Sequence, residues 1–393
     1  MDQETYRKLI SGESRGAVGV VLRLFLQIAA AGYAFITALR NFLYDKGRLK
    51  SHRVNAMVFS IGNITVGGTG KTPLVVWLCN KITKNSKLKT KNCGVAILTR
   101  GYKTRRAFPR LRSGQACAVR RAKNGRNTQY ALHNTEGDEP AILVQSCPQA
   151  KVVVNPDRVA GATEAITGFG AKVLIMDDGF QHRRLHRDID IVTIDATCPF
   201  GYGRMLPAGL LREPITSLKR ADAVIITRCD QIHEAKLSKL EEKLQWVNPD
   251  MIIARSIHRP VCAKLADGKE ISIEQLKGRS VFAFCGIGNP QSFLGTIKNI
   301  GAEPVGSKIY DDHYHYTDDD ISDICAQAIQ LGANLMLTTQ KDWSRLPIEN
   351  RKSKIEMPLA YLAIELKFIS GEDKITQLIE DTLTGKMQKR NDA

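Results

Sequence analysis

The stretch that decides the fold is SIGNITVGGTGKTPLVVWL, residues 60–78. An apolar run leads into a cluster of small residues, Lys71 and Thr72 follow, and an apolar segment typical of a helix begins at Leu74. This order predicts a phosphate-binding loop, because glycines let backbone N–H groups close around a phosphate and a helix N-terminus adds positive charge. The alternative is a tight strand-to-helix turn, since Thr65 stands where the motif usually has its first glycine.

A phosphate loop that binds ATP needs a metal-binding carboxylate at the end of a neighbouring strand. In AKVLIMDDGFQHRRLHRDIDIVTID, residues 171–195, an apolar strand-like run ends at Asp177 and Asp178, and a second one ends at Asp195. Ligands bind at the carboxyl ends of strands in open α/β sheets. We therefore expect Lys71 to hold the β and γ phosphates of ATP and Thr72 to bind Mg²⁺. A plain turn at Asp177 and Asp178 is the alternative.

Three further segments are candidates for the acceptor side. In HNTEGDEPAIL, residues 133–143, Asp138 and Pro140 suit a helix start, where Asp138 either caps the helix or acts on an acceptor hydroxyl. Residues 100–112 and 203–214 place arginines in loops punctuated by Gly and Pro, where recognition usually occurs. Surface arginines without a ligand are the alternative.

Charge and composition limit the partners. The 393 residues are 43% hydrophobic and 25% charged, as in a folded protein with room for two domains. No Asp or Glu occurs from Lys46 to Thr135, where 20 of the 57 basic residues lie. This segment attracts phosphates, nucleic acid or an anionic membrane, unless it is only a solvated basic face. The nine scattered cysteines indicate reduced thiols, with no zinc site or disulfide framework.

Residues 17–44 are predicted to form an amphipathic helix. Their apolar character is uninterrupted only from Leu24 to Leu39, shorter than the roughly 20 residues of a spanning helix, and no cleavage site indicates a removed signal peptide. A small and polar face opposes an apolar face, which holds Phe25, Ile28, Gly32, Phe35, Leu39 and Leu43. Such a helix lies either in a membrane interface or in a protein core, and the basic segment after it favours the membrane.

The expected fold class is α/β. A doubly wound, P-loop NTPase-like domain with a parallel sheet is followed by a charged helix, a β-rich connector and a smaller C-terminal α/β domain, because strand and helix patterns alternate again from residue 279. CGIGNP, residues 285–290, is a weak nucleotide motif, and histidines 313 and 315 suit a loop. The expected division is 1–45 for the N-terminal helix, 46–250, 251–278 and 279–393.

Seven motifs, in this order, resemble the tetraacyldisaccharide 4'-kinase family of lipid A biosynthesis: SIGNITVGGTGKTP, RGY, GDEP, DDGFQHRRLHRDIDI, LPAGLLREP, DDHYHYTD and TTQKD. The resemblance implies that ATP phosphorylates the 4'-hydroxyl of a tetraacyldisaccharide 1-phosphate. It also implies a place at the cytoplasmic face of the bacterial inner membrane, peripheral or monotopic through the N-terminal helix.

The resemblance also implies roles for individual residues. Asp138 orients or deprotonates the acceptor hydroxyl, His313 pairs with it, and Arg212 lies near the transferring phosphate with Lys71. The residues implied to bind ATP are Thr65, Val66, Gly67, Gly68, Thr69, Gly70, Lys71 and Thr72. The residues implied for Mg²⁺ are Thr72, Asp177, Asp178, Gln181 and Glu213. The residues implied for the lipid substrate are Arg100, Tyr102, Glu139 and His182.

The rival reading is a membrane-associated P-loop ATPase without a lipid acceptor. A kinase consumes ATP in proportion to the acceptor lipid, whereas an ATPase does not need it. The basic segment shows no aromatic-interleaved RNA motif, so we expect no nucleic-acid partner. We expect a monomer.

Overall fold

The computed structural model of the chain describes residues 3–13, 16–84, 94–101, 117–118, 138–312, 314–347 and 357–391. Contacts between residues divide it into two compact units. The larger unit comprises Arg7–Ile257 and Phe368–Ala393, and the smaller unit comprises Met1–Tyr6 and His258–Lys367. The four-part division at residues 45, 250 and 278 stays a prediction.

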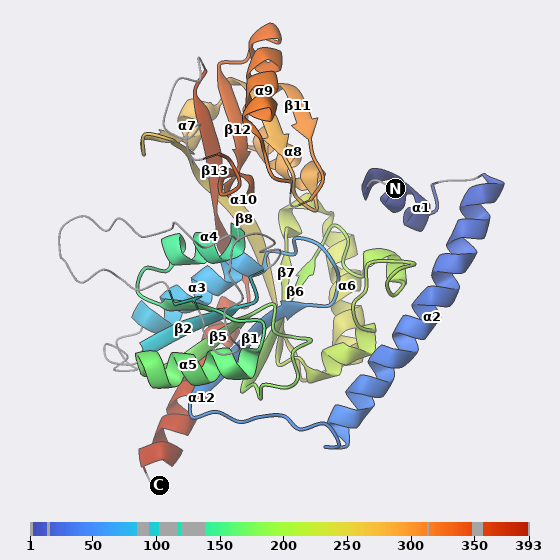
Figure 1. Ribbon diagram of the computed structural model, residues 1–393, viewed down its shortest axis with the longest axis vertical. Coiled ribbons are helices and arrows are strands. Elements are labelled where there is room, and N and C mark those ends of the chain that lie inside the picture. Colours follow the sequence, from blue (N-terminus) through green and yellow to red (C-terminus); the bar gives the residue numbers. More distant parts are fainter. Residues whose placement is uncertain are drawn as a thin grey trace. The chain divides into compact units, whose positions relative to one another are not determined.

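The larger unit is built on a mainly parallel sheet (Figure 1). Its strands lie in the order β8-β7-β6-β1-β5-β2-β4-β3, and among the described pairs only β3 with β4 is antiparallel. The strands are β1 (Met57–Asn63), β2 (Gly94–Thr99), β3 (Cys117–Ala118), β4 (Lys151–Val154), β5 (Ala171–Asp177), β6 (Ile189–Asp195), β7 (Ala223–Thr227) and β8 (Ile252–Leu265). Every residue of β1, β6 and β7 is buried, as parallel strands covered on both faces require.

Helices cover both faces of this sheet. Leu174 and Met176 of β5 pack with Ala162 and Ala165 of α5 in one apolar cluster. Figure 1 shows the strands between α5 and α3. The helices are α2 (Ala17–Asp45), α3 (Lys71–Lys84), α4 (Asp138–Ser146), α5 (Arg158–Phe169), α6 (Glu234–Val247) and α12 (Glu372–Asn391). The predicted doubly wound fold is confirmed.

Helix α2 presents its apolar face outward. Thr37 and Asn41, from the small and polar face, are buried, whereas Phe25, Ile28 and Phe35 are 64–69% exposed. The helix has 29 residues and is long and apolar enough to cross a membrane, by length and composition. The predicted helix over residues 17–44 is confirmed, whereas the expectation that its apolar stretch is too short to span a membrane is not, because that expectation counted only the uninterrupted apolar run. Since the apolar residues are not covered within the larger unit, the core-helix alternative does not describe α2.

In the smaller unit the strands pair in parallel in the order β11-β10-β12-β13, and they belong to the same continuous sheet as the strands of the larger unit. Alternate residues of β10 face opposite ways: Val281 and Ala283 pack with α8, and Phe282 and Phe284 pack with α9. The elements are β9 (Glu270–Ser272), α7 (Ile273–Leu276), β10 (Ser280–Cys285), α8 (Pro290–Asn299), β11 (Glu303–Ile309), α9 (Asp318–Gln330), β12 (Leu335–Thr339), α10 (Gln340–Trp343) and β13 (Leu359–Ser370). Helix α1 (Gln3–Ser11) and strands β8 and β13 have residues in both units.

The C-terminal helix α12 groups with the larger unit, although it follows the smaller unit in the chain. Lys81 of α3 forms an ion pair with Glu372 at 3.3 Å, and the rings of Trp77 and Phe368 lie 4.8 Å apart between centroids. Ile375, Ile379 and Leu383 of α12 are buried. The helix that carries Lys71 is thus supported by the end of the chain.

Candidate active site

The predicted phosphate loop connects β1 to α3. Strand β1 ends at Asn63 and α3 begins at Lys71, so the loop leads straight into a helix N-terminus. Gly67 has φ 121° and Gly70 has φ 85°, a region of backbone conformation that favours glycine. Val66 N–H donates to the carbonyl of Leu210 at 2.7 Å, which holds the start of the loop. The loop has the glycines and the helix end that phosphate binding needs.

Three side chains from β6, β7 and the turn after β7 support the same loop. The hydroxyls of Thr69 and Thr193 are 2.7 Å apart, and Thr227 donates to the carbonyl of Thr69 at 3.1 Å. Arg228 donates from Nη2 to the carbonyl of Gly68 at 2.8 Å, and its Nη1 pairs with the buried Asp195. The sequence analysis missed the roles of Thr193, Thr227 and Arg228. The one feature of the sequence that could have indicated these roles is that the three residues lie in or directly after strands whose ends face the loop.

Two cations meet on Asp178, directly after β5. Lys71 Nζ lies 3.4 Å from Oδ1 of Asp178, and Arg212 Nη1 donates to both carboxylate oxygens at 2.9 and 3.0 Å. Burial alone would raise the pKa of Asp178, but the charges of Lys71 and Arg212 outweigh it and hold the pKa well below its usual range. Asp178 has φ 52°, which Asp tolerates better than most residues. The structure thus brings Lys71, Asp178 and Arg212 together beside the loop.

Asp177 lies at the end of β5 and is buried. Thr99, at the end of β2, donates to Oδ2 of Asp177 at 3.4 Å, and Arg158 donates to the backbone carbonyl of Asp177 at 3.0 Å. The carboxyl ends of β1, β2 and β5 therefore gather polar groups at one edge of the sheet. No group of three or more His, Cys, Asp or Glu that could hold a metal occurs within the described ranges.

Gln181 and His182 follow in the turn after β5. Gln181 donates from Nε2 to the carbonyl of Asn63 at 2.8 Å, so its amide nitrogen braces the end of the loop strand. Burial, with a contribution from the charge of Arg158, lowers the pKa of His182 to about 4. The imidazole is therefore neutral at pH 7 and adds no positive charge to the site.

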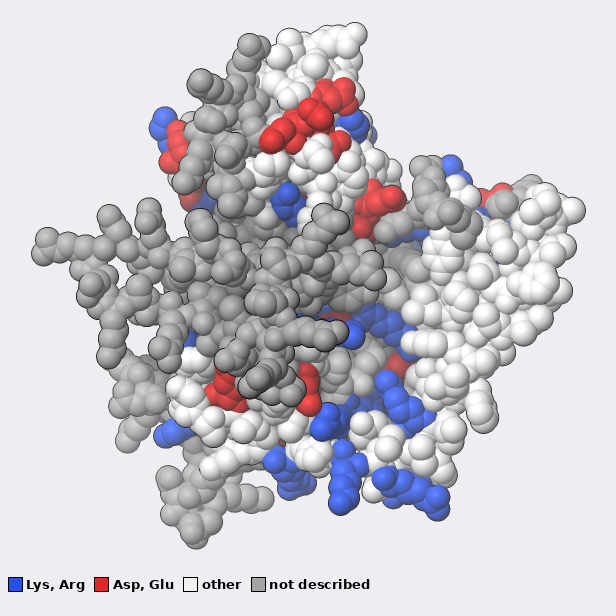
Figure 2. Space-filling model, in the orientation of Figure 1, with Lys and Arg blue, Asp and Glu red and all other residues white. Residues whose placement is uncertain are grey.

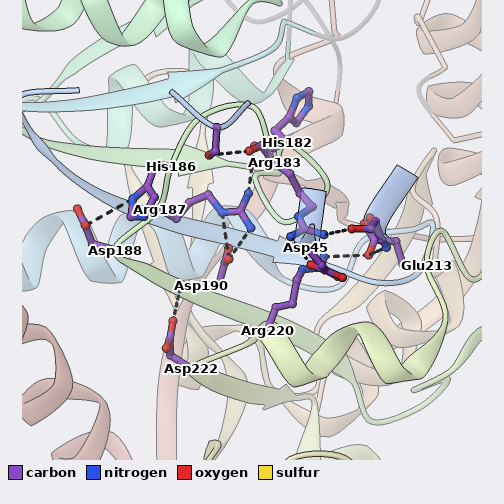
Figure 3. Close-up of polar contacts among 12 residues, drawn as sticks. Asp45, His182, Arg183, His186, Arg187, Asp188, Asp190, Glu213, Arg220 and Asp222 are labelled. Carbon is purple, nitrogen blue, oxygen red and sulfur yellow. Dashed lines mark hydrogen bonds and ion pairs between the residues drawn. The ribbon is translucent and has the colours of Figure 1, made fainter. Parts of the chain in front are cut away.

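Glu213 has a different setting from the one predicted. Its side chain is fully buried, and its two oxygens accept hydrogen bonds from Arg40 at 2.9 Å, Asn41 at 3.1 Å and Arg220 at 2.9 Å. Glu213 and Arg220 are labelled in Figure 3. Both oxygens are thus occupied by partners within the protein. Because its side chain is also closed off from solvent, unlike the partly exposed Asp178, Glu213 is not among the residues that we propose for Mg²⁺.

The remaining predicted residues are placed only in part. Arg100 directly follows β2 and is exposed, and its charge contributes to the lowered pKa of His182. Asp138 and Glu139 begin α4, as predicted for a helix start, but their side chains lie outside the described residues. Tyr102 and His313 lie outside them altogether.

This geometry defines the class of protein. A strand that ends in a glycine loop, a lysine at the first turn of the next helix and an acidic residue after the adjacent parallel strand make a P-loop nucleotide-binding protein. The second cation, Arg212, suits a phosphotransferase of that class, because charge neutralisation is the main demand of phosphoryl transfer.

Comparison with known proteins gives the family. The model of the family described as tetraacyldisaccharide-1-P 4'-kinase matches residues 22–384. The tetraacyldisaccharide 4'-kinase of Halothermothrix orenii is 32% identical over 383 residues, 94% of this chain and 95% of that protein. The Syntrophus aciditrophicus enzyme is 37% identical over 356 residues, 88% of this chain and 89% of that protein. This chain belongs to the tetraacyldisaccharide-1-P 4'-kinase family.

A solved structure agrees with this assignment. The crystal structure of LpxK from Aquifex aeolicus in complex with ATP matches this chain with a TM-score of 0.66 at 30% sequence identity. The match covers 92% of this chain and 99% of that chain. The likeness therefore extends over both units.

Proposed function

We propose that this chain transfers the γ-phosphate of ATP to the 4'-hydroxyl of a tetraacyldisaccharide 1-phosphate. Membership of the family supports the acceptor, and one observation supports the transfer: Lys71 and Arg212 converge on Asp178 beside the glycine loop. Two cations and a helix N-terminus at one point provide the charge that a transferring phosphate needs.

The phosphate loop from Thr65 to Thr72 would hold the phosphates of ATP. Lys71 would neutralise their charge and Arg212 would stabilise the phosphate in transit. The residues fit Mg²⁺, because this ion usually takes one or two carboxylates and keeps phosphate and water oxygens. The Thr72 hydroxyl with Asp177 or Asp178 would hold it. When bound, Mg²⁺ supplies further charge neutralisation at the phosphates.

The acceptor side rests on the family resemblance. Asp138 would orient the acceptor hydroxyl and take its proton, and His313 would assist Asp138. Neutral His182, with Arg100, would contribute hydrogen bonds and charge on the substrate side. Tyr102 and Glu139 complete the proposed substrate residues.

We also propose that helix α2 lies at the cytoplasmic face of the inner membrane. Figure 2 shows a largely uncharged surface on this helix, with Lys and Arg side chains gathered near its lower end. Lys46, Arg48, Lys50 and Arg53 follow the helix and are exposed. Exposed apolar residues beside cations suit an interface of acyl chains and anionic head groups. A lipid acceptor would then reach the enzyme within the plane of the membrane.

Transfer of labelled γ-phosphate to tetraacyldisaccharide 1-phosphate in detergent micelles with Mg²⁺ tests the reaction. The wild type should label the lipid, Lys71→Ala should not, and Lys81→Ala, on the same helix but paired with Glu372, should keep activity. Hydrolysis of ATP without labelled lipid in the wild type would overturn the proposal in favour of an ATPase.

A further inference from the structure

Glu213 is a buried carboxylate that receives two of its three described partners from helix α2. Arg40 and Asn41 donate to it from α2, and Arg220 donates from the 3-10 helix Ile215–Arg220. Figure 3 labels Glu213 and Arg220 among their polar contacts. A buried carboxylate depends on such partners, because water cannot replace them. The position of Glu213 is therefore coupled to the position of α2.

Helix α2 also binds the residue before Glu213. The hydroxyl of Tyr33 donates to the backbone carbonyl of Arg212 at 3.0 Å. Lower on the helix, Arg183 donates to the carbonyl of Asn41 at 3.0 Å and pairs with Asp45 at 2.7 Å. The polar face of α2 thus contacts the segment Arg212–Glu213 directly and is itself fixed to the turn after β5.

The carbonyl of Arg212 contacts α2, whereas its backbone N–H and its guanidinium contact the candidate active site. Its backbone N–H donates to the carbonyl of Ile64, the residue directly before the phosphate loop, at 2.7 Å. Its guanidinium contacts Asp178, which also contacts Lys71. One residue therefore lies between the membrane-facing helix and the phosphate loop.

We propose that Glu213 is a positioning residue: held by Arg40 and Asn41 of α2, it keeps Arg212 against Asp178 and Lys71. This inference rests on the proposed function, since Arg212 is taken to act on the transferring phosphate. The rate of phosphoryl transfer then depends on how α2 packs against the rest of the larger unit. The helix is part of the catalytic geometry as well as a membrane contact, which links docking at the lipid surface to turnover.

The test compares Glu213→Gln and Arg40→Gln with the wild-type full-length chain. Arg40 is partly exposed, so its variant is expected to fold even if Glu213→Gln does not. We expect kcat to fall roughly 5- to 100-fold, which corresponds to the interaction free energies usually found between residues in contact. The KM for ATP should change much less. Arg255→Gln, which removes pairs with Glu234 and Glu241 elsewhere in the larger unit, is the control and should keep both constants.

The Arg212→Ala background separates positioning from a general loss of stability. If Glu213 acts through Arg212, Glu213→Gln and Arg40→Gln should cost little further activity in that background. Losses of equal size in both backgrounds would overturn the proposal. So would a change confined to the KM for ATP.

Hydrogen exchange provides a readout that needs neither ATP nor lipid. The amide of Arg212 should exchange faster in Arg40→Gln than in the wild type and in Arg255→Gln, because its segment loses its support. Unchanged exchange would overturn the proposal. A wild-type protein that transfers no phosphate to the lipid would instead overturn the proposed function, and the exchange result would still decide whether α2 holds Arg212.

Discussion

Arg212 donates from one nitrogen to both oxygens of Asp178, at 2.9 and 3.0 Å, although 34 residues separate the two in the chain. Lys71 approaches the same carboxylate from the first turn of α3. Because Asp178 touches both cations, it fixes their spacing at the phosphate loop.

Replacing Asp178 with Asn should lower kcat by roughly 10²-fold, the loss typical of removing one electrostatic contact in an active site. The variant leaves two cations facing a neutral amide. Steady-state kinetics with ATP and lipid measure this, and an unchanged kcat would contradict the role of Asp178.

The pairs of Asp178 also predict a pH dependence of stability. The pKa of Asp178 is lowered in the folded state, so the unfolded chain binds the proton more readily. Its contribution is present above the unfolded pKa of about 3.9 and is lost as pH falls through the folded pKa. The difference in unfolding temperature between wild type and Asp178→Asn should be constant from pH 5 to 8 and shrink at lower pH. A difference that grows on acidification would refute this.

His182 should titrate with a midpoint near 4 in the folded protein. The folded pKa is below the ordinary histidine pKa of 6.5, so between these two values the unfolded state binds more protons and stability falls as pH is lowered. NMR titration of the imidazole gives the midpoint, and one near 6.5 would show that the ring is not shielded from water. His182→Gln should make stability less dependent on pH over this window.

Arg228→Ala should destabilise the protein by about 3–5 kcal/mol, because it leaves Asp195 as a buried charge without its cation. It should also weaken ATP binding, since the contact with Gly68 is lost. Chemical denaturation and nucleotide titration measure the two effects. The double variant with Asp195→Ala should recover part of the stability; equal or greater loss in the double variant would show that the ion pair is not the cause.

Ile28→Glu and Phe35→Glu should each reduce binding to vesicles that contain anionic lipid. We expect a loss of affinity of roughly tenfold or more, because this corresponds to the free energy of burying one large apolar side chain. Both residues are exposed on α2. Trp246→Glu is the matched control, because Trp246 is also a large exposed apolar residue, at 82%, but lies on α6. Equal losses in all three variants would point to a general effect of charge.

Much of the larger unit could be predicted because its signals are local. The apolar runs gave β1 and β5, and the glycines with Lys71 gave the loop between β1 and α3. Asp177 and Asp178 could be assigned to the same edge as the loop, since carboxyl ends of parallel strands share an edge.

Other features could not be predicted from local patterns. The family resemblance implied Glu213 as a metal ligand, yet its partners Arg40 and Asn41 lie 173 and 172 residues away in the chain. The support of the loop by Thr227 and Arg228 likewise spans 158 and 160 residues. No sequence spacing encodes such pairs.

The sequence by itself determined the α/β class, the place of the phosphate loop and the amphipathic character of α2, because each depends on the order of neighbouring residues. Only the tertiary structure decided which side chains share a site. It set Arg212 beside Asp178, turned the polar face of α2 toward Glu213 and left the apolar face exposed. The physical reason is that hydrogen bonds and ion pairs act over a few ångströms in space, whatever the distance along the chain.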